Sequence, residues 1–262
     1  MGEVIVITSG KGGVGKTTST ANLGAALALS GKRVVLIDAD IGLRNLDVIV
    51  GLENQIVYDI IDVFSGDCEL NRALIKDKRY PNLFLLPASQ TSGKDAIFPK
   101  QMQRLCADLK KEYDYVLIDC PAGIEQGFMN AIAGAERALI VATPDVSSVR
   151  DADRVRKLLT DNDIKKTDLI LNRIHIDLMQ QGEIMSLEDI AEILPINIIG
   201  AVPDDSRVIV SASQGVPAVS DKSSIAGAAY RDIAKRVMGM DVPFMDLGEK
   251  KGFFSKLRRV FG

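Results

Sequence analysis

Short runs of apolar residues recur along this chain, and segments with helical spacing of apolar and polar positions separate them. Because the runs do not alternate with polar residues, they predict strands that are covered on both faces, as in a parallel sheet. The sequence therefore predicts an α/β fold with a doubly wound, mostly parallel sheet. The predicted strands are residues 4–8, 34–37, 83–86, 115–118, 138–142, 169–171 and 198–202.

The last segment with the spacing of a core helix is residues 225–237, and no repeat or long linker precedes Met240. We therefore expect one domain over residues 1–240, a linker over 241–251 and a separate amphipathic helix over 252–262. One stripe of that helix would be apolar and the rest cationic. The apolar positions are Phe253, Phe254, Leu257, Val260 and Phe261, and the cationic ones are Lys256, Arg258 and Arg259.

A helix with aromatic residues opposite basic ones is typical of segments that lie on an anionic membrane surface. The alternative is a helix that packs against the body of the protein.

Positive charge is concentrated at this end of the chain. Residues 249–262 carry five Lys or Arg and one Glu, whereas the whole chain has a net charge of −3. The rest of the chain has a negative net charge, so we do not expect a nucleic-acid partner, because nucleic-acid binding needs clustered positive charge.

The three cysteines and one histidine indicate neither a disulfide framework nor a zinc site. Cys68, Cys106 and Cys120 do not have paired spacing, and His175 is the only histidine. The chain shows no signal peptide pattern and no apolar run of 18 residues, so we expect a reducing, cytoplasmic compartment.

A glycine-rich segment follows the first predicted strand and precedes a helical pattern over residues 19–30. It fits the G-x-x-x-x-G-K-[ST] pattern, in which backbone N–H groups and a helix N-terminus surround a polyphosphate. The predicted α/β fold is therefore of the P-loop NTPase type. Lys16 would neutralise phosphate charge, and the Thr17 hydroxyl would bind Mg²⁺. The alternative is a simple turn. The nucleotide-binding residues predicted here are Gly10, Lys11, Gly12, Gly13, Val14, Gly15, Lys16, Thr17 and Thr18.

Acidic residues end two further predicted strands. Asp38 and Asp40 follow residues 34–37, and Asp119 ends the run YVLID before Pro-Ala-Gly. Carboxylates at these positions could bind a Mg²⁺ water or orient an attacking water, and the glycine could sense the γ-phosphate as part of a switch. The alternative is that they are solvated acids in strand-end turns.

Polar residues at the ends of the last two predicted strands could contact an adenine base. They are Asn172 and Arg173 after one strand, and Pro203 and Asp204 after the other. Asn45, in the loop after Asp40, is a further nucleotide-binding candidate. Polar residues often simply cap strands, so this alternative stays open.

The motifs KGGVGKTT, DADIGLRNLD and DCPAG, in this order, resemble those of the deviant Walker A (ParA/MinD) family of ATPases over essentially the whole chain. The resemblance implies that residues 1–240 form a P-loop ATPase domain and that ATP and Mg²⁺ are the cofactors. It also implies that Lys11 reaches the phosphates of the opposite subunit in an ATP-bound homodimer. Lys16 would act within its own subunit, and Asp40 would orient the hydrolytic water. Thr17, Asp38 and Asp119 would form the Mg²⁺ environment, and Asn172 would face the base.

Within the family, the chain is similar to ATPases that place the division site and cycle on and off the membrane. This similarity implies peripheral attachment to the inner face of the cell membrane, a division inhibitor (MinC-like) as partner, and an activating partner (MinE-like or other). The partner surface would lie in residues 147–154, at Ser148, Arg150, Asp151 and Asp153.

Other branches of the family fit the sequence less well. Iron-sulfur carriers and nitrogenase iron proteins need interface cysteines, often as C-x-x-C, which this chain lacks. DNA-partition ATPases carry basic patches, whereas this body is acidic. Flagellar-number ATPases share the membrane helix but usually carry an N-terminal extension. A nucleotide-gated scaffold with little turnover stays open as another class of function.

Overall fold

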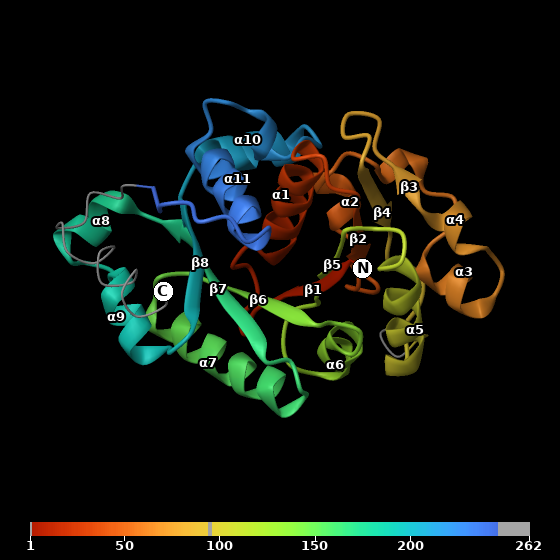
Figure 1. Ribbon diagram of the computed structural model, residues 1–262, viewed down its shortest axis with the longest axis horizontal. Helices are drawn as coiled ribbons and strands as arrows, with labels where there is room; N and C mark the ends of the chain where they lie inside the picture. The colour runs from red at the N-terminus through yellow and green to blue at the C-terminus, as the bar shows by residue number, and fades with distance from the viewer. Residues whose placement is uncertain (1, 94–95, 246–262) are drawn as a thin grey trace.

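A sheet of eight strands runs through the part of the chain that the computed structural model describes, residues 2–93 and 96–245 (Figure 1). The strand order is β3-β4-β2-β5-β1-β6-β7-β8, and every neighbouring pair is parallel except the short β3 against β4. The strands are β1 (Glu3–Thr8), β2 (Val34–Asp38), β3 (Ile75–Lys76), β4 (Leu83–Leu86), β5 (Tyr115–Asp119), β6 (Arg137–Ala142), β7 (Lys166–Ile174) and β8 (Asn197–Pro203).

Helices cover both faces of this sheet (Figure 1). On one face lie α1 (Lys16–Leu29), α2 (Leu46–Ile49), α10 (Ser206–Ser213) and α11 (Ile225–Val237). On the other face lie α5 (Pro99–Leu109), α6 (Gln126–Ile132), α7 (Val146–Asp161) and α9 (Leu187–Ile193). The shorter elements are α3 (Ile60–Ser65), α4 (Leu70–Ala73), α8 (Ile176–Gln181) and the 3₁₀ turns η1 (Glu53–Gln55) and η3 (Ala218–Ser220).

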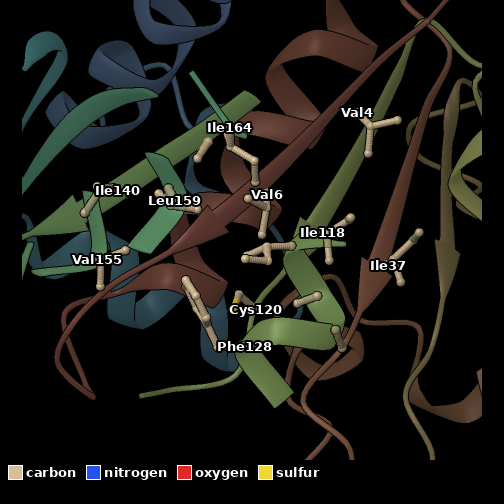
Figure 2. Packing of buried hydrophobic residues seen from close by; sticks show 14 of the residues in the cluster. Val4, Val6, Ile37, Ile118, Cys120, Phe128, Ile140, Val155, Leu159 and Ile164 are labelled. Carbon is tan, nitrogen blue, oxygen red and sulfur yellow. The ribbon is translucent and has the colours of Figure 1, made fainter. Parts of the chain in front are cut away.

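Each face of the sheet has its own hydrophobic core, which is why the central positions of the strands are apolar without alternation. Val4 and Val6 of β1 belong to the same core cluster as Phe128 of α6 and Val155 of α7, and Figure 2 labels all four. Ile5, one position along the same strand, belongs to the opposite core. The seven predicted strands and the doubly wound sheet are confirmed.

The carboxyl ends of the parallel strands meet along one edge of the sheet, and the predicted motifs follow these ends. Asp38 at the end of β2 is the register partner of Asp119 at the end of β5, and Ile7 of β1 is also paired with Asp119. The fold thus gathers the phosphate loop and the acidic motifs at this edge.

The predicted amphipathic helix, residues 252–262, and part of the predicted linker lie outside the described residues. Among the residues that are described, no helix is both long enough and apolar enough to cross a bilayer.

Candidate nucleotide and magnesium site

The phosphate loop joins β1 to the N-terminus of α1, and its glycines are required by their backbone conformation and their neighbours. Gly13 and Gly15 have φ values of 77° and 98°, a left-handed backbone conformation that residues with a side chain rarely adopt. A Cβ at Gly15 would lie 2.3 Å from Asn172 Nδ2, whereas one at Gly13 would meet nothing within 4 Å. The loop is therefore packed on one side and open on the other, as a phosphate cradle must be.

Lys16 is held inside this loop. Its side chain belongs to the first turn of α1 and is only 7% exposed, and its Nζ donates a hydrogen bond to Ser9 Oγ at 3.0 Å. Ser9 Oγ in turn donates to the carbonyl oxygen of Lys11 at 2.7 Å. A buried ammonium beside open backbone N–H groups is suited to bind an anion.

Two buried carboxylates, Asp38 and Asp119, lie at the ends of the neighbouring strands β2 and β5. Burial raises the pKa of Asp119 to about 8, and the charge of Asp38 adds to this rise, while Thr17, Lys16 and Thr20 oppose it. Burial likewise raises the pKa of Asp38 to about 6, against hydrogen bonds from backbone N–H groups. Two adjacent buried acids whose ionised forms are disfavoured need a cation to hold both charges, so this site fits Mg²⁺.

The hydroxyls of α1 complete this site. Thr20 Oγ1 donates to Asp119 Oδ1 at 3.1 Å, and Thr17 also hydrogen-bonds this carboxylate. Among the described residues, no group of three or more His, Cys, Asp or Glu side chains could hold a metal alone. The donors present, two carboxylates and the Thr17 hydroxyl, suit Mg²⁺, which binds one or two carboxylates together with waters and substrate phosphates.

Asp40 lies beside the predicted switch. Its side chain is partly buried and lines a small cavity with Ile41, Pro121 and Asn130, and its backbone N–H donates to Asp38 Oδ1 at 3.0 Å. Gly123 has a φ of 93° in the same switch segment. The fold therefore brings together the two acidic motifs that the sequence separates by about 80 positions.

Lys11 is placed differently from Lys16. Its side chain is 47% exposed, and its Nζ donates to Ser147 Oγ at 3.1 Å and lies 3.6 Å from Asp145 Oδ1. Asp145 is the N-cap of α7 and accepts from the Ser148 N–H at 3.0 Å. Lys11 thus lies on the outer rim of the loop, against the start of α7.

The candidate base-binding residues differ in their surroundings. Asn172 is buried, and its Nδ2 donates to the Val14 carbonyl at 2.8 Å, so this side chain supports the phosphate loop. Arg173 is exposed with a φ of 56°, and Asp204 is exposed beside His175 at 3.7 Å. Pro203 is buried at the end of β8, and Asn45 is exposed at the start of α2.

Three of the four candidate partner-surface residues are accessible on α7. Arg150 is exposed, Asp151 pairs with Arg154 at 3.5 Å, and Asp153 pairs with Arg156 and Lys157. Ser148 is different, because it is 2% exposed and its Oγ accepts from the Thr143 N–H at 3.0 Å. A direct contact of the Ser148 side chain with a partner does not fit this position.

Sequence reasoning missed Ser9, Thr20 and Asp145, although two of them carry a signal. Thr20 follows Lys16 by one helical turn, so both lie on the same face of α1. Asp145 precedes an apolar-periodic segment at the position of an N-cap. Ser9 has no separate signal, because its role depends on how the loop folds back on itself.

Comparison with known proteins gives consistent matches along the whole chain. A family model described as an AAA domain matches residues 2–170. The septum site-determining protein MinD of Bacillus subtilis is 52% identical over 265 residues, which span 100% of this chain and 99% of that protein.

Solved structures agree with this result. In the MinC:MinD cell division protein complex of Aquifex aeolicus, one chain is 49% identical, with a TM-score of 0.87 over 93% of this chain and 98% of that one. Septum site-determining MinD of Pyrococcus horikoshii, complexed with Mg-ADP, is 30% identical, with a TM-score of 0.82 over 90% of this chain and 96% of that one.

Proposed function

This chain belongs to the MinD family of septum site-determining ATPases, and from this premise we propose how its own residues perform the ATPase cycle and membrane attachment. The chain hydrolyses ATP to ADP and phosphate with Mg²⁺ and acts in division-site placement. The observation that carries the proposal is a set of three buried side chains at the open glycine loop: Asp38 and Asp119 are paired at the ends of neighbouring strands, and the charge of Lys16 acts on Asp119.

Each side chain of this group would have one task. Lys16 would hold the phosphates of its own subunit, since its ammonium is already fixed inside the loop by Ser9. Thr17, Asp38 and Asp119 would hold Mg²⁺, which when bound neutralises developing charge on the phosphates. Asp40 would orient the attacking water, because a carboxylate beside the switch can accept its proton or hydrogen bond.

Lys11 would act on the partner subunit of an ATP-bound homodimer. Its side chain lies at the rim and its contacts with Ser147 and Asp145 are exposed. Exposed ion pairs contribute about 0–1 kcal/mol, so exchanging them for a phosphate across an interface needs little free energy. Dimerisation would therefore depend on a bound triphosphate in each subunit.

Residues 252–262 would attach the dimer to the inner face of the cell membrane. Three Phe and two aliphatic residues opposite basic residues favour an anionic lipid surface. An eleven-residue helix is marginal in water, so one tail would bind weakly. Two tails on one dimer would raise the avidity by ~10²–10⁴, which makes membrane attachment depend on ATP.

The exposed side of α7 would receive the division inhibitor. The Aquifex aeolicus relative has been solved in a complex with MinC, which supports a partner of that kind for this chain. Arg150, Asp151 and Asp153 present both signs of charge there, and such pairs favour orientation and specificity over affinity. The same dimer face would receive the activating partner.

Sedimentation with vesicles that contain anionic phosphatidylglycerol tests the proposal. The chain should sediment with ATP and Mg²⁺ but not with ADP, and phosphate release should rise when the vesicles are added. Binding without turnover would instead indicate a nucleotide-gated scaffold. Retention on DNA rather than on vesicles at physiological salt would indicate a partition ATPase.

A further inference from the structure

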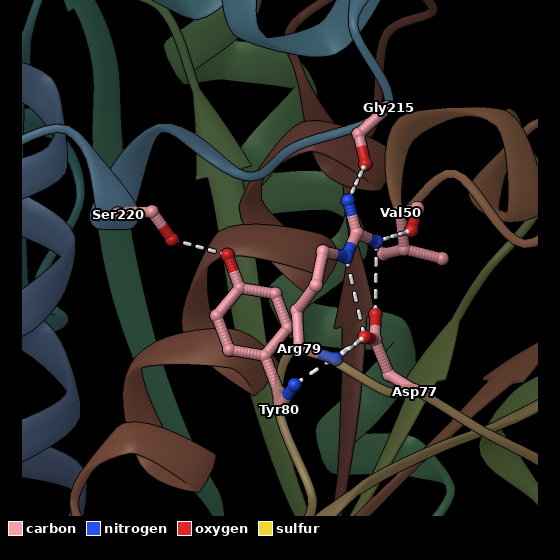
Figure 3. Close-up of polar contacts among 6 residues, drawn as sticks. All are labelled: Val50, Asp77, Arg79, Tyr80, Gly215 and Ser220. Carbon is pink, nitrogen blue, oxygen red and sulfur yellow. Dashed lines mark hydrogen bonds and ion pairs between the residues drawn. The ribbon is translucent and has the colours of Figure 1, made fainter.

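Arg79 joins three parts of the chain that are far apart in the sequence (Figure 3). It lies between β3 and β4, and its guanidinium donates to the carbonyl oxygens of Val50, after α2, and Gly215, after α10, the latter at 2.6 Å. Asp77 is 1% exposed and accepts from Arg79 Nε at 3.3 Å and from Nη2 at 3.0 Å. The planar guanidinium is thus held by a buried carboxylate while it binds two backbone segments.

The two segments that Arg79 joins touch through their backbones. Gly51 and Gly215 both have left-handed backbone conformations, with φ values of 62° and 64°. A Cβ at Gly215 would lie 2.6 Å from Gly51 Cα, and one at Gly51 would lie 2.6 Å from the Gly215 carbonyl oxygen. No side chain fits between them, so the end of α2 has a fixed distance from the loop after α10.

The other end of α2 contacts the predicted magnesium site. The Leu46 N–H, in the first turn of α2, donates to Asp38 Oδ2 at 3.2 Å. α2 contains four residues and is about 6 Å long, so a shift at one end moves the other. Leu46 and Val50 are both fully buried, which leaves this short helix little freedom.

We propose that Arg79 is a positioning residue for Mg²⁺ binding, an inference that rests on the proposed metal role of Asp38. By holding Val50 and Gly215, Arg79 fixes where α2 lies. α2 in turn presents the Leu46 N–H that orients the Asp38 carboxylate. Partners that orient metal ligands commonly change metal affinity when they are lost.

Binding of a fluorescent ADP analogue to the full chain, with Mg²⁺ and with EDTA, tests this proposal. Arg79→Ala should leave the affinity in EDTA close to that of the parent and reduce the Mg²⁺-dependent gain by about tenfold, the low end of the range for ligand-orienting partners. Arg79→Lys should give an intermediate loss, because one amine can pair with Asp77 but cannot reach both carbonyls.

Arg72→Ala is the matched control. Arg72 lies on α4, packs over the Tyr58 ring and donates to its hydroxyl at 3.0 Å, as Arg79 packs over Tyr80. This variant should keep the full Mg²⁺-dependent gain. An equal loss of affinity in Mg²⁺ and in EDTA for Arg79→Ala would overturn the proposal, because it would show a general packing role.

Gly215→Ala gives an independent test that removes no polar group. Its Cβ would push against Gly51, so the same Mg²⁺-dependent gain should fall while the EDTA affinity stays. A parent-like gain in both Arg79→Ala and Gly215→Ala, beside a lost gain in Asp38→Asn, would overturn the inference alone. A parent chain without any Mg²⁺-dependent gain would overturn the proposed metal role and this inference with it.

Discussion

The two lysines of the phosphate loop have different surroundings although five positions separate them. Lys16 is 7% exposed and donates a hydrogen bond to Ser9, whereas the Lys11 side chain is 47% exposed and contacts Ser147 and Asp145 at the start of α7. A buried ammonium can serve only the anion within its own loop. An exposed one at the rim is able to reach a second molecule.

Lys11→Ala should therefore keep nucleotide binding by the monomer and lose ATP-dependent dimerisation and hydrolysis. The charge of Lys11 is needed only at the phosphates of the facing subunit, while Lys16 and the loop backbone stay in place. Light scattering with ATP measures the dimer, and Lys111→Ala, which removes an exposed lysine paired with Asp108, is the control. A normal dimer of Lys11→Ala would contradict the proposed role.

Asp40→Ala should keep nucleotide binding and remain on vesicles as an ATP-bound dimer. Loss of the group that orients water lowers the hydrolysis rate by about 10²–10⁴, while the phosphate loop is unchanged. Phosphate release and the rate of dissociation from vesicles measure the two effects. Asp67→Ala, at an exposed acid, should behave like the parent. If Asp40→Ala leaves vesicles as fast as the parent, Asp40 does not orient the water.

At this scale the sequence predicted what is local and missed what depends on packing. The glycines, Lys16 and Thr17 are contiguous, so their pattern defines a phosphate loop by itself. The inward position of Ser148 and the bond from Asn172 to Val14 depend on how α7 and β7 pack against other elements. The spacing of residues along the chain does not predict these contacts.

Among the elements, the buried strands and the long helices could be predicted, while the segment between β2 and β4 could not. Each buried strand is an unbroken apolar run, and α11 shows a clear helical period. β3 has two residues and α2 has four, which is too few to show a period. Yet the Leu46 N–H of α2 donates to Asp38, and Arg79, which follows β3, donates to Val50 just after α2. The part of the fold that the sequence did not predict therefore includes contacts close to the proposed metal site.

The N-cap of α7 gives a prediction at the scale of the element. Burial alone would raise the pKa of Asp145. Hydrogen bonds from Thr143, Ser147 and the Ser148 N–H, together with the charge of Lys11, outweigh this effect and lower the pKa to about 2. Asp145→Ala should reduce the free energy of unfolding by about 1 kcal/mol, a typical value for a lost N-cap. Asp145→Asn should be nearly neutral at pH 7, because an amide oxygen can still cap the helix.

The sign of the pH effect follows from the lowered pKa. The stabilisation by ionised Asp145 is present above about pH 4, the ordinary range of the group, and is lost as the pH falls towards 2. Urea unfolding at pH 7, 4 and 2.5 should show this loss in the parent and less of it in Asp145→Asn. The same acid dependence in both proteins would show that other carboxylates cause it.

At the scale of the whole molecule, the described residues just before the predicted tail bear on the proposed membrane attachment. Arg236 donates to the carbonyls of Val242 at 3.0 Å and Pro243 at 2.9 Å, and it packs over the Phe244 ring at 4.1 Å. The first residues of the predicted linker are therefore held against the body. A short tether keeps the effective concentration of the second tail high once the first is bound.

Phe254→Glu should abolish binding to anionic vesicles and leave ATP-dependent dimerisation unchanged. The new charge lies on the predicted apolar stripe, where it removes one aromatic side chain from the lipid and adds repulsion from anionic headgroups. Each dimer carries the change twice, so avidity multiplies the loss. Ser255→Glu adds the same charge to the polar face and should weaken binding much less.

Deletion of residues 252–262 should give the same result as Phe254→Glu, because the deleted segment contains none of the phosphate, magnesium or base-binding candidates. Vesicle sedimentation measures attachment, light scattering measures the dimer, and thermal unfolding measures the fold. Binding of the parent should also weaken with salt, since part of the attraction is electrostatic. If the shortened chain instead loses stability or no longer dimerises with ATP, the segment packs against the body, and the packed-helix alternative replaces the membrane helix.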